Sequence, residues 1–166
     1  MIRPACDKDI LDILEIYNEA IINSTAVYDY FPVTLENRLS WFKERMEADY
    51  PVLVFEVANR VVGFSTYGSF RSKPAYQFTV EHSVFVHKDF RGRKIGYQLM
   101  KALLEKAESR DVAVMIGCID ADNKESIRLH EKLGFSFSGL IQRAGFKFGR
   151  YLDVVFYQYN LKGPER

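Results

Sequence analysis

The feature that most constrains the fold of this chain is a junction near its middle, where a strand-like run leads through a basic loop into a helix-like run. Residues 78–86 are rich in Val and Phe, and residues 95–109 place apolar side chains along one helical stripe. In between, four of the seven residues from 88 to 94 are basic, and Gly92 and Gly96 allow close backbone approach. Free N–H groups at a helix N-terminus carry roughly half a positive charge, so this junction predicts an anion site.

The kind of anion is narrowed by two motifs that the sequence lacks. It has no G-K-[ST] pattern, which would hold a nucleoside triphosphate with Mg²⁺, and no G-x-G-x-x-G pattern for a dinucleotide. ATP and NAD are therefore disfavoured as ligands. The alternative to an anion site is an ordinary strand-to-helix turn with solvated basic side chains.

The order of the periodic segments predicts a domain that contains both helices and a sheet. Helical periodicity occurs in residues 10–22, 34–46, 95–109 and 124–133, and strand-like runs occur in residues 52–58, 61–67, 78–86 and 112–119 and twice between 135 and 161. With a short strand expected ahead of residue 10, the chain reads as a strand, two helices, three strands, a helix, a strand, a helix and a closing pair of strands. This order is typical of a layered α/β or α+β domain rather than a helical bundle or a β-sandwich.

Composition excludes several classes of protein. A chain of 166 residues, 48% hydrophobic and 27% charged, predicts one folded domain over residues 1–166. No run of 18 apolar residues and no signal peptide is found, so we expect a cytoplasmic protein without a membrane span. The two cysteines, Cys6 and Cys118, lie far apart, which fits a reducing compartment. We expect Cys118, in an apolar strand, to be a buried small hydrophobe.

Charge and histidine spacing argue against nucleic acid and metal. Residues 1–81 carry 8 Lys/Arg against 12 Asp/Glu, whereas residues 82–166 carry 15 against 10. The second half is basic, but it lacks the extended Lys/Arg surface of a nucleic-acid binder, and the pI is about 7.7. His82 and His87 are five residues apart and would point to opposite faces of a strand, so we expect no metal site.

The connector between the first two predicted helices is unusually aromatic. Residues 24–32 include Tyr28, Tyr30 and Phe31. Exposing all three rings would be unfavourable, so this loop is predicted either to pack on the body of the domain or to line a pocket.

Two motifs, in order, resemble those of a known family. The run Arg91-Gly92-Arg93-Lys94-Ile95-Gly96, after Val84-Phe85-Val86, resembles the acetyl-CoA pyrophosphate loop of the GNAT superfamily of N-acetyltransferases. The run Asn123-Lys124-Glu125-Ser126, ahead of Leu133-Gly134-Phe135, resembles that superfamily's second CoA-binding segment. The usual loop is R-x-x-G-x-G or R-x-x-G-x-A, and Lys94 stands in place of its middle glycine, where it can add a cation.

Three further runs, residues 79–86, 126–135 and 144–153, resemble the phosphinothricin and methionine sulfoximine acetyltransferases, and the similarity extends from Ile2 to about Leu161. This resemblance implies a mixed, mostly antiparallel, V-split sheet of about seven strands with about four helices, and a homodimer. It implies that acetyl-CoA is the cosubstrate, with no metal, and that the acetyl group passes directly to the α-amino group of methionine sulfoximine, methionine sulfone or phosphinothricin.

The same resemblance assigns the catalytic residues. Glu81 is expected to be the general base that deprotonates the acceptor ammonium, because a carboxylate with a raised pKa can serve near neutral pH. The alternative for Glu81 is a strand-edge ion pair. Asn123, Ser126 and His130 share one helical stripe, and His130 is expected to act as an acid or a base, with a hydrogen-bonded packing histidine as the alternative.

The resemblance also assigns the binding residues. The cofactor is expected to contact Val84, Phe85, Val86, Arg91, Gly92, Arg93, Lys94, Ile95, Gly96, Tyr97, Asn123, Ser126 and Lys132. The acceptor is expected to contact Tyr28, Arg71, Lys73, Pro74, Ala75 and Tyr76, with Arg71 or Lys73 clamping its carboxylate or phosphinate. Two alternatives remain for function: acetylation of another amine, such as a protein N-terminus or a polyamine, and a non-catalytic acyl-CoA sensor.

Overall fold

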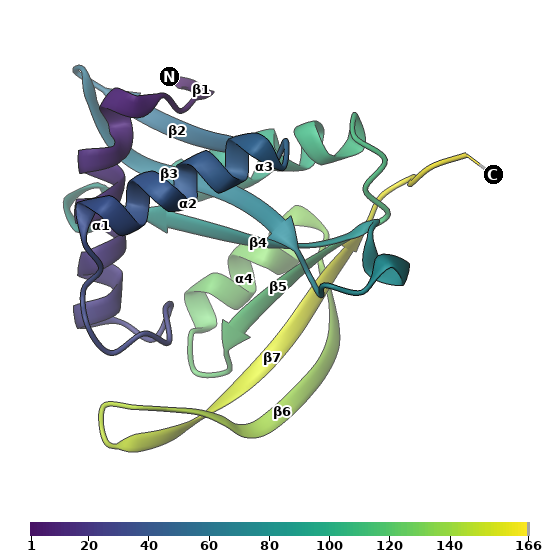
Figure 1. Cartoon of the computed structure of the whole chain (residues 1–166). Helices are drawn as coiled ribbons and strands as arrows, with labels where there is room; N and C mark the ends of the chain where they lie inside the picture. The colour runs from purple at the N-terminus through teal and green to yellow at the C-terminus, as the bar shows by residue number, and fades with distance from the viewer. Residues whose placement is uncertain (166) are drawn as a thin grey trace.

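The computed structural model describes residues 1–165 as an open seven-stranded sheet with helices on both faces (Figure 1). The strands are β1 (Ile2–Pro4), β2 (Val52–Val57), β3 (Arg60–Ser69), β4 (Thr79–Val86), β5 (Val114–Asp120), β6 (Ser136–Lys147) and β7 (Arg150–Asn160). The α-helices are α1 (Ile10–Asn23), α2 (Leu35–Glu47), α3 (Ile95–Glu108) and α4 (Lys124–Leu133). The predicted order of elements and the mixed α/β fold class are confirmed.

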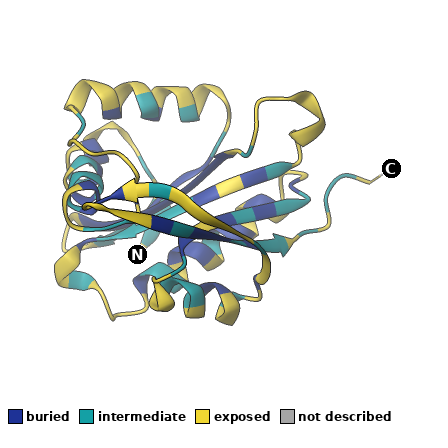
Figure 2. Cartoon of the chain, turned by 90° about the horizontal axis from the view of Figure 1, so that it is seen from below, coloured by how far each residue is buried: buried dark blue, intermediate teal, exposed yellow. Residues whose placement is uncertain are grey.

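The strand order is β1-β2-β3-β4-β5-β7-β6, and every neighbouring pair is antiparallel except β4 and β5. Side chains on each strand alternate between the two faces of the sheet. Val52 and Val54 therefore meet α1 and α2 on one face, while Leu53 meets α3 on the other. The helices bury their apolar stripes against these faces and leave their outer surfaces exposed, as Figure 2 shows.

Local signals in the sequence mark where several elements begin and end. The hydroxyl of Thr34 accepts a hydrogen bond from the Asn37 N–H and caps α2. Gly134, at φ 99°, ends α4 in the left-handed conformation that glycine adopts without strain. Ala58 and Asn59 both have positive φ in the tight β2–β3 turn, which matches the right-handed twist of a hairpin.

The sheet splits between β4 and β5. Their parallel pairing covers only three positions and ends where Glu81 faces Ile116, although β4 continues to Val86 and β5 to Asp120. Figure 1 shows the two strands separating beyond this point, with α4 beside the opening. The edge of β4 that faces the opening therefore offers backbone groups to a ligand.

Within residues 1–165, no helix is both long enough and apolar enough to cross a bilayer.

The packing between β2 and the α1–α2 layer yields a prediction about stability. Val54 is 0% exposed, so Val54→Ala removes buried methyl groups and should lower the free energy of unfolding by about 2 kcal/mol. Val57→Ala, on the same strand but 39% exposed, is the matched control and should change it by less than about 0.5 kcal/mol. Urea unfolding of both variants measures the difference, and equal effects would contradict the assigned packing.

Candidate active site

The split between β4 and β5 opens into two connected hollows. The first, called the inner cavity, has a volume of about 200 Å³. The second, called the outer groove, has a volume of about 460 Å³. Both are lined by Ala26, Val84, Asn123 and Ser126, so they form one continuous site.

The outer groove lies at the N-terminus of α3. Its walls include most of the residues expected at the cofactor: Val84, Val86, Arg91, Gly92, Lys94, Ile95, Gly96, Tyr97, Asn123, Ser126 and Lys132. Of the expected set, Phe85 lines the inner cavity and packs on Phe64, and Arg93 lies outside both walls with its guanidinium over the Phe90 ring. The structure adds Arg128 to the groove, one turn before Lys132 on α4.

Lys94 adopts a backbone conformation that explains why a glycine is usual in such a loop. It is the N-cap residue of α3 and has φ 61°, in the left-handed region that disfavours a side chain by about 1–2 kcal/mol. The loop therefore keeps the shape that a glycine would give it. The lysine adds a cation to the groove, beside the free N–H groups of α3.

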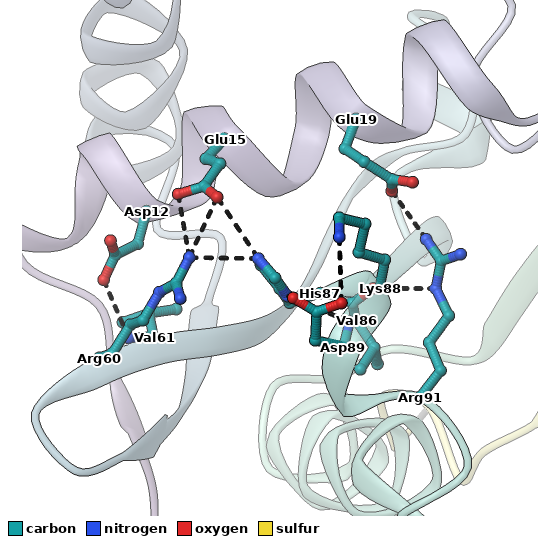
Figure 3. Close-up of polar contacts among 10 residues, drawn as sticks. All are labelled: Asp12, Glu15, Glu19, Arg60, Val61, Val86, His87, Lys88, Asp89 and Arg91. Atoms are coloured by element: carbon teal, nitrogen blue, oxygen red, sulfur yellow. Dashed lines mark hydrogen bonds and ion pairs between the residues drawn. The ribbon is translucent and has the colours of Figure 1, made fainter.

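Arg91 is held in place by α1. Its Nε donates to the Val86 carbonyl at 3.2 Å and one terminal nitrogen donates to the Glu19 carboxylate at 2.8 Å. Figure 3 shows this contact beside a second cluster, in which Glu15 of α1 accepts from Arg60 and lies 3.4 Å from His87. The end of β4 and the basic loop are thus tied to α1 by charged side chains.

Glu81 lies on the wall of the inner cavity. The same cavity is lined by Tyr28 from the α1–α2 connector and by Cys118 from β5. Removal from water raises the pKa of the Glu81 carboxyl, and the positive charge of Arg71 partly opposes this shift. A carboxylate with a raised pKa beside a small cavity can accept a proton near neutral pH.

His130 forms a buried pair with His82 under the inner cavity. The His130 Nδ1 lies 2.6 Å from the Ser126 carbonyl and its Nε2 lies 2.8 Å from the His82 Nε2. A carbonyl only accepts, so Nδ1 carries the proton and the neutral His130 ring accepts from His82 through Nε2. Both nitrogens of His130 are therefore engaged, which favours the packing alternative for this residue.

Gly117 on β5 makes room for this pair. A Cβ at Gly117 would lie 2.9 Å from the His82 Nε2 and 3.0 Å from the His130 Nε2. Within residues 1–165, the His82 Nδ1 has no hydrogen-bond partner. Burial lowers the pKa of both imidazoles, so both rings are neutral in the folded protein near pH 7.

The residues expected at the acceptor are only partly brought together. Tyr28 lines the inner cavity, whereas Arg71, Lys73, Pro74, Ala75 and Tyr76 are exposed and lie outside its wall. Arg71 stacks 5.0 Å from the Phe70 ring, and of these five residues it is the one whose charge acts on Glu81. In the aromatic connector, Tyr28 lines the inner cavity, as one of the two alternatives predicted, whereas Tyr30 and Phe31 are 60% and 81% exposed, so the expectation that the rings are covered is wrong for these two.

The expectation for Cys118 is wrong. The residue is exposed and lines the inner cavity, because β5 has left β4 before this position and no strand covers that side. Partial desolvation and the nearby Glu81 carboxylate raise the pKa of its thiol to about 11, so it is a poor nucleophile at neutral pH. Among residues 1–165, no group of three or more His, Cys, Asp or Glu side chains is arranged to hold a metal ion.

Three polar residues of the inner cavity had no role in the sequence prediction. Ser83 follows Glu81 by two positions and shares its face, and Asp120 follows Cys118 in the same way. Strand alternation was the available signal for both. Thr25 donates its hydroxyl proton to Asp120 across 95 residues of sequence, which only the tertiary fold reveals.

Comparison with known proteins places this geometry in context. The model of the GNAT acetyltransferase family matches residues 10–135. The chain is 45% identical to the L-methionine sulfoximine/L-methionine sulfone acetyltransferase of Pseudomonas aeruginosa over 161 residues, which is 96% of this chain and 94% of that protein.

Solved structures agree with this similarity. An N-acetyltransferase from Staphylococcus aureus superposes with a TM-score of 0.97 at 44% identity, covering 98% of both chains. A GNAT phosphinothricin acetyltransferase from Sinorhizobium meliloti, solved in complex with acetyl-CoA, superposes with a TM-score of 0.94 at 33% identity, covering 97% of this chain and 88% of its own.

The buried histidine pair yields a prediction about pH. Burial lowers the pKa of both imidazoles below the ordinary 6.5, so at low pH the unfolded chain binds more protons than the folded protein does. The free energy of unfolding therefore decreases as the pH falls through 6.5 and below it. His82→Phe removes one of the two groups, so the loss of unfolding free energy between about pH 7.5 and pH 5.5 should become smaller. Urea unfolding across this range measures it, and parallel pH curves for the two proteins would refute the assignment.

Proposed function

This chain belongs to the GNAT family and is an acetyl-CoA-dependent N-acetyltransferase, and on that premise we propose that it acetylates the α-amino group of methionine sulfoximine, methionine sulfone or phosphinothricin. The observation that carries the proposal is the position of Glu81. Its carboxylate lies in the small inner cavity, which is continuous with a larger groove at a helix N-terminus.

The outer groove suits the cosubstrate. The unpaired N–H groups of the first turn of α3 favour a pyrophosphate, and Lys94, Arg128 and Lys132 add positive charge around it. The β5-facing edge of β4, near Val84 and Val86, is available for hydrogen bonds with the amides of the pantetheine arm. The thioester would then lie where the groove meets the inner cavity.

The proposed chemistry is a direct transfer. Glu81, itself or through a water, takes the proton of the acceptor ammonium, and the free amine attacks the thioester carbonyl carbon. Negative charge develops on the carbonyl oxygen, and backbone N–H groups near Val84 and Val86 would hold it. The C–N bond forms, the nitrogen loses its second proton, the C–S bond breaks, and CoA leaves as a thiolate that takes up that proton.

We assign His130 an indirect part in this reaction. Its Nδ1–H donates a hydrogen bond to the Ser126 carbonyl. This bond holds the first turn of α4, where Asn123 and Ser126 line both hollows. The other ring nitrogen, Nε2, accepts from His82, so neither nitrogen of His130 is left free to exchange a proton with the acceptor. His130 therefore acts in this proposal through the placement of α4.

The acceptor end is proposed to be built by Tyr28 and Arg71. Tyr28 supplies an aromatic wall next to Glu81. Arg71, whose charge already acts on Glu81, would bind the carboxylate or phosphinate of the acceptor, with the rest of the 71–76 segment beside it.

We also propose that the protein works as a cytoplasmic homodimer. The β6–β7 hairpin extends from the body of the domain (Figure 1) and carries large exposed apolar side chains: Phe137, Leu140, Ile141, Phe146, Phe148 and Tyr151. Such a patch is the kind of surface that a second copy of the chain would cover.

Substitution of Glu81 tests its proposed role as the general base. Glu81→Gln keeps the size of the side chain but cannot accept the proton, so turnover should fall by about 10²-fold or more, while acetyl-CoA affinity stays within about threefold. Release of CoA thiol and calorimetry measure the two quantities. Glu36→Gln, an exposed position on α2, is the matched control and should behave like the unaltered protein. Undiminished turnover in Glu81→Gln would remove Glu81 from the mechanism.

The second prediction tests the acceptor. Purified protein with acetyl-CoA should release CoA thiol in the presence of methionine sulfoximine, methionine sulfone or phosphinothricin, and not without an acceptor. If the protein binds acetyl-CoA but releases no CoA thiol with any of the three acceptors, the proposed acceptor class is refuted. Polyamines and peptides with free N-termini, tested alongside, would then show whether another amine is the substrate.

A further inference from the structure

The chain contains a buried lysine that the proposed chemistry leaves without a role. Lys147, at the end of β6, is 4% exposed. Its Nζ donates to the carbonyls of Ile21 at 2.6 Å, Ser24 at 2.9 Å and Val27 at 2.7 Å. An ammonium group has three N–H donors, so each of them has a partner.

The three carbonyls belong to the segment that leaves α1. Ile21 lies in the last turn of α1, whose carbonyls lack partners within the helix and carry partial negative charge. Ser24 and Val27 lie in the aromatic connector beyond it. A single cation from β6 therefore ends α1 and sets the path of the chain that follows, over a sequence distance of more than a hundred residues.

The two residues before Lys147 hold the same connector. A Cβ at Gly145 would lie 2.6 Å from the Tyr28 Cε2, so the Tyr28 ring packs directly on the backbone of β6. The hydroxyl of Tyr30 donates to the Phe146 carbonyl at 2.6 Å. Three consecutive residues of β6 thus hold the stretch from Ile21 to Tyr30.

The held stretch forms one wall of the inner cavity. Tyr28 lines that cavity together with Glu81 and Cys118. Neither Lys147 nor any of the three residues whose carbonyls it binds lines the outer groove. A disturbance at Lys147 should therefore reach the inner cavity and leave most of the groove wall in place.

We propose that Lys147 is a positioning residue for the acceptor: its three hydrogen bonds set the place of the connector and hence of the Tyr28 ring in the cavity that Glu81 also lines. This assignment rests on the proposed function, in which the inner cavity receives the acceptor. It also gives a role to the 145–147 part of the motif at 144–153, which the chemistry itself did not use.

The test compares acceptor and cosubstrate. Lys147→Met keeps the length of the side chain and removes all three hydrogen bonds, so the KM for methionine sulfoximine should rise by about tenfold or more, while the calorimetric Kd of acetyl-CoA changes by less than about threefold. Gly145→Ala, which displaces Tyr28 with Lys147 intact, should raise the same KM. Val54→Ala, whose core cluster contains no residue of the connector, is the control for lost stability and should leave this KM unchanged.

A second readout does not depend on turnover. Amide hydrogen exchange in residues 22–30 should be faster in Lys147→Met than in the unaltered protein, and the same in Val54→Ala after correction for global stability. If the unaltered protein acetylates no acceptor, the proposed function fails. Amide hydrogen exchange then still tests whether Lys147 holds residues 22–30 in place. Unchanged exchange, or an unchanged acceptor KM in folded Lys147→Met, would overturn the proposal. Should Lys147→Met fail to fold, an unchanged acceptor KM in Gly145→Ala would overturn it.

Discussion

The early separation of β4 from β5 is the constraint on which the rest of this structure depends. A sheet gains free energy by pairing its backbone groups, yet these two parallel strands pair only from Thr79 to Glu81. The buried His82 and His130 rings pack in the opening, and Gly117 leaves room for both. Because the strands separate, one edge of β4 is left without a strand partner, and Glu81, at the last paired position, lines the inner cavity.

Helix α1 connects the two ends of this opening. At the groove, Glu19 holds Arg91, and one turn earlier on α1 Glu15 holds Arg60 of β3 (Figure 3). At the inner cavity, the last turn of α1 and its connector receive the Lys147 ammonium. Exposed ion pairs such as those of Glu15 and Glu19 add little stability, so their main effect is to orient the loop, whereas the buried Lys147 must keep its partners.

Much of the fold and part of the site could be predicted from local patterns. Periodicity predicted the order of helices and strands, and the basic loop with Gly92 and Gly96 pointed to the place of the outer groove, because strand-to-helix geometry is local. Cys118 was predicted wrongly, since an apolar strand next to a split is covered on one side only. Thr25 and Lys147 were missed as site residues because their partners lie about a hundred residues away.

The sequence by itself determined what is encoded within a few residues: the amphipathic stripes, the caps at Thr34 and Gly134, the cationic loop and the carboxylate of Glu81. Only the tertiary structure decided which side chains share the inner cavity, which nitrogen of His130 carries a proton, and why a lysine near the C-terminus lies beneath an N-terminal loop. The physical reason is that hydrogen bonding, burial and pKa depend on neighbours in space. Those neighbours are set by packing across the whole sheet rather than by spacing along the chain.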